Sequence, residues 1–240
     1  LGPEPSADSH RRRDGRPISE AVTDRRMTTR TVWDQEQALI EWAHASISAT
    51  PTTTDPQLAA VQAVTGDAAL ALVVGPAGTG KTTALGRAVR HLDEQGRPVI
   101  GLAPSGKAAD VLAAETGCPA VTLAKLLADL RTQDSPAGTT VILDEAGMCS
   151  TDDLDRLVRL VDARRWRLVC VGDPEQLPSV GRGGMFAHWC ETLPTIDLIE
   201  VHRYDEDWQA EASLALRRGD PAAVRAYADR GRVRGVHPAL

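Results

Sequence analysis

Aromatic residues and cysteine motifs are scarce in this 240-residue chain, and both scarcities limit what it can be. Five Trp, two Tyr and one Phe leave Ala, Val and Leu to build the core. The four cysteines lie twenty or more residues apart without a C-x-x-C pair, which excludes a zinc knuckle and a disulfide framework. Free thiols are typical of a reducing compartment, so we expect a cytoplasmic protein.

Long hydrophobic runs are also missing. No apolar stretch approaches transmembrane length and there is no signal peptide, so we expect no membrane contact. A net charge of −6 excludes a basic coat over the whole surface, but it leaves room for a local groove that binds nucleic acid. Residues 1–30 carry seven Arg against five acids and little apolar content, which predicts a disordered linker. The first residue is Leu1 rather than Met, which indicates a piece of a longer protein.

Lysine is the rarest charged residue, with three copies against 24 Arg. One of them, Lys81, lies in G-P-A-G-T-G-K-T, which fits G-x-x-x-x-G-K-[ST] at every fixed position. Glycines in such a loop turn backbone N–H groups toward one anion, and the helix that follows adds its positive end. The pattern predicts a site for the phosphates of a nucleoside triphosphate, with Mg²⁺ on the hydroxyl of Thr82. The predicted nucleotide-binding residues of this loop are Gly75, Pro76, Ala77, Gly78, Thr79, Gly80, Lys81, Thr82 and Thr83.

Strand and helix signals alternate along the rest of the chain. The predicted strands are 70–74, 99–103, 140–143, 167–171 and 195–200, and a long Gly/Pro loop fills 172–184. The predicted helices are 33–47, 56–64, 81–95, 107–115, 122–130, 151–163, 208–217 and 221–228. Such alternation is typical of an α/β fold with a parallel sheet and helices on both faces. We expect a small helical segment at 31–54, the main domain at 55–235 and a tail at 236–240.

Two adjacent acids follow the apolar strand 140–143. Carboxylates at a strand end beside a phosphate loop suit Mg²⁺ and water. Asp144 can hold the metal, directly or through its water shell, and Glu145 can polarise the attacking water as a general base. Alone, the pair could equally be an acidic turn; beside the phosphate loop, the catalytic interpretation is favoured.

Two further strand ends supply candidates for sensing the γ-phosphate. The segment G-D-P-E-Q-L-P follows strand 167–171, and the amide of Gln176 can hydrogen-bond a γ-phosphate before but not after hydrolysis. Arg203, in V-H-R-Y after strand 195–200, could stabilise charge that develops on the phosphates. A Pro-bounded loop and a surface arginine are the simpler alternatives for these two.

The strand 99–103 ends in P-S-G-K-A-A, away from the nucleotide loop. A proline, a small hydroxyl and a glycine before a helix make a second anion-binding helix start. A nucleic-acid backbone phosphate is a sensible ligand, with Ser105 and Lys107 contributing.

Taken in order, these segments resemble the motifs of helicase superfamily one, RecD-like branch. G-P-A-G-T-G-K-T resembles motif I, A-P-S-G-K-A-A motif Ia, T-L-A-K-L-L motif Ib, L-D-E-A-G-M motif II, V-G-D-P-E-Q-L-P-S-V motif III and V-H-R-Y motif IV. The segments D-E-A-G-M and S-L-A-L-R-R-G-D-P also resemble the helicase part of conjugative relaxases of the MobF type.

The resemblance implies a first RecA-like P-loop NTPase domain of an ATP- and Mg²⁺-dependent translocase that moves 5′ to 3′ on single-stranded DNA. By position, it implies that Gln57 reads adenine and that Thr82 and Asp144 bind the metal. It implies catalytic roles for Lys81, Glu145, Gln176 and Arg203, the last as an arginine finger. It also implies DNA contacts by Pro104, Ser105 and Thr122. The implied partners are a second RecA-like domain and a relaxase domain of the parent chain, and conjugation or type IV secretion proteins.

Two features depart from that pattern. Only 37 residues follow Arg203, too few for a second RecA-like domain, so we expect little unwinding by this chain alone. The six histidines are scattered, so strand-nicking chemistry is not encoded here. The alternative function is a degenerate helicase-like module that binds DNA or recruits partners with little ATP turnover, which the intact Lys81, Asp144, Glu145 and Gln176 argue against. A small-molecule kinase would not need the acidic and Gln-bearing strand ends.

Overall fold

The computed structural model describes residues 28–47, 51–76, 78–129, 134–176, 179, 181–198, 206–217 and 219–233. The chain divides into two units, 1–35 and 36–240. The second unit contains the sheet and most of the helices.

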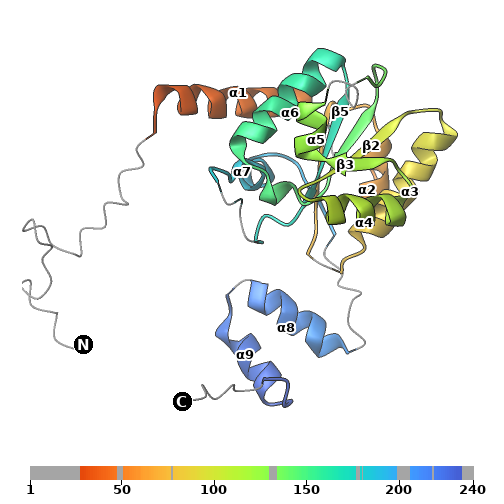
Figure 1. Cartoon of the computed structure of the whole chain (residues 1–240). Helices are drawn as coiled ribbons and strands as arrows, with labels where there is room; N and C mark the ends of the chain where they lie inside the picture. Colours follow the sequence, from red (N-terminus) through yellow and green to blue (C-terminus); the bar gives the residue numbers. More distant parts are fainter. Residues whose placement is uncertain are drawn as a thin grey trace, which may run out of the picture. The chain divides into compact units, whose positions relative to one another are not determined.

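A six-stranded parallel sheet forms the centre of this unit (Figure 1). Its strands are β1 (Leu70–Val74), β2 (Val99–Ala103), β3 (Ala120–Thr122), β4 (Thr140–Leu143), β5 (Arg167–Gly172) and β6 (Ile196–Asp197). The order across the sheet is β3-β2-β4-β5-β1-β6, and every pairing is parallel. The predicted parallel α/β architecture is therefore confirmed.

Helices cover both faces of the sheet. They are α1 (Arg30–Ser46), α2 (Pro56–Thr65), α3 (Lys81–Glu94), α4 (Gly106–Thr116), α5 (Leu123–Ala128), α6 (Thr151–Arg164) and α7 (Met185–Thr192), with a 3-10 turn η2 (Ala146–Met148) after β4. Buried side chains of α1, α5, α6 and α7 pack on one face, and those of α2, α3 and α4 pack on the other.

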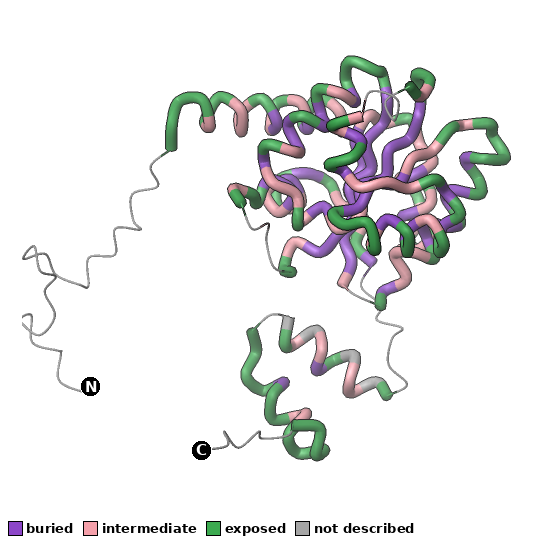
Figure 2. Tube along the Cα trace, viewed as in Figure 1, coloured by how far each residue is buried: buried purple, intermediate pink, exposed green. Residues whose placement is uncertain are grey.

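Strand β1 shows why two cores form. Leu70, Leu72 and Val74 belong to the first core and Ala71 and Val73 to the second, because successive strand side chains point to opposite faces. All five residues are buried, as expected for a strand covered on both sides. The strands appear as buried segments inside more exposed helices in Figure 2.

Three local predictions were wrong in detail. The segment predicted as helix 122–130 begins as strand β3 and becomes helix only at Leu123, because Val121 and its neighbours pair with β2. Helix α7 was not predicted, since glycines crowd the sequence just before it. Strand β6 is two residues long within the described part of the predicted strand 195–200, and residues 199 and 200 lie outside it.

Two further helices, α8 (Asp207–Arg217) and α9 (Pro221–Ala228), form a hairpin. Asp220 caps α9 by accepting a hydrogen bond from the backbone N–H of Ala222 at 2.8 Å. The Trp208 ring meets Tyr227 edge-on with centroids 5.4 Å apart, and the Arg230 guanidinium lies 4.3 Å from the Trp208 ring centroid. None of the described helices is long and apolar enough to cross a membrane.

Candidate functional site

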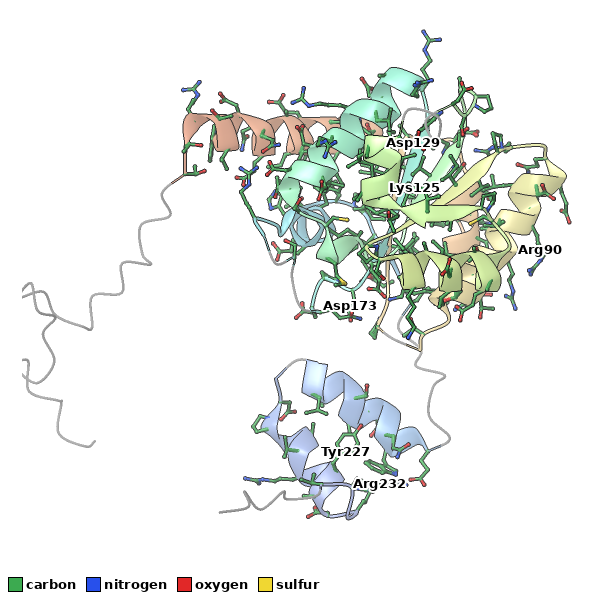
Figure 3. All side chains as sticks on the ribbon, in the orientation of Figure 1. Arg90, Lys125, Asp129, Asp173, Tyr227 and Arg232 are labelled. Atoms are coloured by element: carbon green, nitrogen blue, oxygen red, sulfur yellow. The ribbon has the colours of Figure 1, made fainter. Side chains whose placement is uncertain are left out.

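The candidate site lies at the carboxyl ends of β1, β5 and β4, which are neighbours in the sheet. The glycine-rich loop follows β1, the acids follow β4, and the Gln176 loop follows β5 between them. Figure 3 labels Asp173, which lies in the loop that leaves β5. Because ends of parallel strands meet at one edge, three segments from distant parts of the sequence come together there.

The glycine-rich loop has little room for side chains. Gly78 and Gly80 have φ angles of 84° and 82°, in the left-handed region that glycine enters without cost. A Cβ on Gly75 would stand 2.5 Å from Thr79 Oγ1, and one on Gly80 would stand 2.7 Å from Gln57 Nε2. Lys81 begins α3 and donates from Nζ to the Gly75 carbonyl at 2.9 Å. The loop is thus wrapped closely around the start of α3, with the Lys81 ammonium folded back over it.

Gln57 contacts this loop from α2. Asp55 caps α2 and Pro56 occupies its first turn, so the local sequence fixes where the helix starts. Gln57 Nε2 donates to the backbone carbonyl of Thr79 at 3.0 Å. Among the described residues, its Oε1 is buried and has no hydrogen-bond partner. An acceptor left in that state fits a ligand that donates a hydrogen bond, as the amino group of adenine would.

An open hollow of about 760 Å³ lies over the loop and α3. Its lining residues are Gln57, Gly78, Gly80, Lys81, Thr82, Thr83, Arg87 and Glu115. The sequence prediction missed Arg87 and Glu115. Arg87 could have been found from its position four residues after Thr83 on the same helix face. Glu115 lies near the end of α4 and reaches the hollow through tertiary packing, which no local sequence pattern predicts.

The two acids after β4 differ in their surroundings. Asp144 Oδ1 accepts a hydrogen bond from the Glu145 backbone N–H at 3.0 Å. Burial raises the pKa of Asp144, the negative charge of Glu145 raises it further, and the Lys81 ammonium partly offsets both effects. Glu145 adopts φ 52° and ψ 43°, a left-handed conformation unusual for a residue with a side chain.

The donor set fits Mg²⁺ bound together with a phosphate. Carboxylate and hydroxyl oxygens, here those of Asp144 and Thr82, are its preferred protein ligands. In the part of the chain that the structure describes, no three His, Cys, Asp or Glu residues group into a metal site. Mg²⁺ commonly uses one or two protein ligands and takes the rest from substrate phosphates and water, so a full protein cage is not required.

The loop after β5 is organised by Asp173. This buried carboxylate accepts from the Glu175 N–H at 3.1 Å, and the Asp173 carbonyl accepts from the Gln176 N–H at 3.2 Å. The Gln176 side chain is exposed. Two residues predicted for the site, Ala77 and Arg203, lie outside the described residues.

The residues predicted to contact DNA lie at the ends of β2 and β3. These strands are paired with Ala103 opposite Thr122, so their carboxyl ends are adjacent. Ser105 caps α4, accepting from the Ala108 N–H at 3.2 Å. Thr122 caps α5, accepting from the Lys125 N–H at 3.1 Å.

Three of the predicted DNA contacts are accessible to a ligand: the side chains of Pro104, Ser105 and Lys107 are exposed, while Thr122 is half-buried. The capped starts of α4 and α5 therefore follow the adjacent carboxyl ends of β2 and β3.

Residues 52–238 match the family model described as an AAA domain. The chain belongs to the AAA domain family. Its motifs and relatives place this AAA domain in the RecD-like branch of superfamily one helicases, of the conjugative relaxase type.

Several curated proteins are similar to this chain in sequence. The chain is 37% identical over 184 residues to conjugal transfer protein TraA of Rhizobium radiobacter, covering 75% of the chain and 17% of that protein. It is 31% identical over 240 residues to the RecBCD enzyme subunit RecD of Mycolicibacterium smegmatis, covering 81% and 43%. It is 37% identical over 125 residues to multifunctional conjugation protein TraI of Escherichia coli K12, covering 48% and 7%. The chain thus spans less than half the length of these relatives.

Proposed function

We propose that this chain is the first, ATP-hydrolysing motor domain of a translocase that moves 5′ to 3′ on single-stranded DNA. The observation that carries the proposal is the meeting of the glycine-rich loop, the Asp144–Glu145 pair and the Gln176 loop at one edge of the sheet. A site for binding phosphate needs only the first of these. Hydrolysis also needs a group that activates water and a group that responds to the γ-phosphate.

The phosphates bind at the start of α3. The backbone N–H groups of the loop and the positive end of α3 attract them, and Lys81 exchanges the Gly75 carbonyl for a phosphate oxygen. Thr82 and Asp144 hold Mg²⁺, which neutralises phosphate charge when bound. The raised pKa of Asp144 supports this role, because a cation nearby would stabilise the carboxylate that burial disfavours.

Glu145 orients and deprotonates the attacking water, and the exposed amide of Gln176 contacts the γ-phosphate. Loss of that contact after hydrolysis would alter the loop that leaves β5. Arg203 is assigned the arginine-finger role on the motif V-H-R-Y alone. Gln57 completes the nucleotide site by accepting from adenine with its unpartnered Oε1.

The DNA strand runs over the ends of β2 and β3. Exposed Pro104, Ser105 and Lys107, together with Thr122, contact its backbone. In the parent protein, a second RecA-like domain closes the nucleotide site, and a relaxase domain and secretion proteins act with this motor in the cytoplasm. The relatives named for conjugal transfer support this context.

The proposal is tested with Lys81→Ala and Glu145→Gln, with Lys125→Ala as a control at an exposed lysine on α5. Lys81→Ala should weaken ATP binding at least roughly tenfold, because a charge-assisted contact to phosphate is lost. Glu145→Gln should keep ATP binding but lower the hydrolysis rate on the order of 10²-fold or more. In the absence of DNA, Lys125→Ala should change neither.

Binding is measured by calorimetry and turnover by phosphate release, each with and without single-stranded DNA. Unchanged ATP affinity in Lys81→Ala would refute the site. DNA binding without any turnover in the full-length parent would favour the recruitment module instead.

A further inference from the structure

The carboxyl end of α2 is held by a buried arginine from another strand. Arg167, the first residue of β5, donates from Nη2 to the Ala63 carbonyl at 3.2 Å and from Nη1 to the Val64 carbonyl at 2.8 Å. Its Nε donates to the Ala68 carbonyl, just past the helix, at 2.7 Å. The last carbonyls of a helix have no partner within it, so Arg167 supplies what α2 lacks.

A second arginine takes the next two carbonyls. Arg97 donates from Nη1 to the Thr65 carbonyl and from Nη2 to the Gly66 carbonyl, the latter at 3.0 Å. Asp67 lies 3.9 Å from Arg97 and is exposed, so it screens this cation only weakly. Burial and, to a lesser extent, the Arg97 charge lower the pKa of Arg167 to about 10, so Arg167 is still a cation at neutral pH. Two cations thus face the negative end of the α2 dipole.

The opposite end of α2 carries Gln57. This helix has ten residues and so is about 15 Å long. At its start, the Gln57 amide reaches the Thr79 carbonyl and lies where a Cβ on Gly80 would touch it. If α2 tilted by about 5° about the end that Arg167 and Arg97 hold, this amide would move by roughly 1 Å, enough to lose its hydrogen bond.

We propose that Arg167, with Arg97, is a positioning residue for nucleotide-base recognition: it fixes α2 so that Gln57 stands at the base position beside the phosphate loop. This inference rests on the proposed nucleotide site and extends it to the amino end of β5, at the opposite end of the strands from the phosphate loop. Neither arginine lines the hollow over the loop, so any effect on the base must pass through α2.

A double-mutant cycle tests the proposal on the 240-residue chain. Binding of ATP and of inorganic triphosphate, each with Mg²⁺, is measured for wild type, Arg167→Met, Gln57→Ala and the double variant. Arg167→Met should weaken ATP binding roughly tenfold, the effect of one or two hydrogen bonds, and leave triphosphate binding within about twofold. In the Gln57→Ala background it should weaken ATP binding no further. A loss that is equal for ATP and triphosphate, or that persists without Gln57, would overturn the proposal.

The matched control is Arg159→Met, an exposed arginine on α6 bonded to Asp155, which removes the same charge and should change neither ligand. Arg167→Lys keeps the cation with fewer donors and should recover part of the ATP affinity. If Arg167→Met does not fold, Arg97→Met removes the outer half of the clamp, and the same cycle applies with a smaller loss.

Hydrogen exchange separates failure of this inference from failure of the proposed function. Wild type that binds no ATP would refute the nucleotide site. Hydrogen exchange would then still show whether Arg167 and Arg97, the two arginines that clamp the end of α2, hold this helix in place. Amides of α2 and of residues 78–80 should exchange faster in the clamp variant than in wild type. Unchanged exchange at both places would overturn the clamp.

Discussion

Gly80→Ala should damage the phosphate loop through two separable effects. The first is backbone strain, because φ at Gly80 is 82° and a left-handed residue with a Cβ costs about 1–2 kcal/mol. The second is a clash, because the new Cβ would stand 2.7 Å from Gln57 Nε2. Gln57 must move, and its bond to the Thr79 carbonyl, worth about 1 kcal/mol, is lost. Alanine also lowers the conformational entropy of the unfolded chain, which restores about 0.5 kcal/mol of stability.

The free energy of unfolding should therefore fall by about 2 kcal/mol. In a chain of this size that lowers the melting temperature by roughly 4–8 °C. Gly96→Ala is the matched control, since φ is 67° and nothing lies within 4 Å of its Cβ. It should show the strain alone, about 1 kcal/mol net.

Urea unfolding of both variants, and of Gly80→Ala combined with Gln57→Ala, separates the two effects. Without the Gln57 side chain to displace, Gly80→Ala should cost no more than Gly96→Ala. An undiminished cost in that background would show that Gln57 does not pack against the loop, and the reasoning would be wrong.

Two further predictions concern groups whose pKa is raised. Asp144 has a folded-state pKa above its ordinary value of 3.8, so the folded, nucleotide-free protein loses stability as pH rises through that window. Asp144→Asn should raise the melting temperature at neutral pH, by a margin that shrinks toward acid pH, while abolishing hydrolysis; a lower melting temperature at neutral pH would contradict this. Burial raises the pKa of Cys149 and Cys190 to about 12, so at pH 8 only about one thiol in ten thousand is ionised. Both thiols are only partly buried, so the raised pKa is what should slow alkylation by iodoacetamide in native buffer, and rapid labelling there would count against it.

Much of the site could be predicted because its signals are local. An apolar strand followed by G-P-A-G-T-G-K-T specifies a strand, a loop and a helix, and the structure has β1, the loop and α3 in those places. Asp55 before Pro56 is a complete helix start, and α2 begins there. The acids and Gln176 follow apolar strands, so their place at a strand end needed only the strand assignments.

The rest depends on contacts between distant segments. That β5 lies between β1 and β4 follows from strand order, which sequence spacing does not encode. Glu115 reaches the hollow, and Arg97 and Arg167 reach α2, only because helices and strands pack in one particular way. Helix α7 was missed because the glycines before it favour a loop, whereas the burial of Met185, Phe186 and Trp189 stabilises a helix.

The left-handed backbone at Glu145 restricts how this domain can change over generations. With φ 52°, the position tolerates Gly, Asn or Asp, and it penalises Val, Ile or Thr. Neutral drift at residue 145 toward Gly or Asn would therefore favour folding while removing the carboxylate that we propose activates water. Glutamate is the demanding choice for folding, which fits the role in turnover that we propose for its carboxylate. Under the proposed mechanism, homologous chains with Gly or Asn at this position should fold but should not hydrolyse ATP.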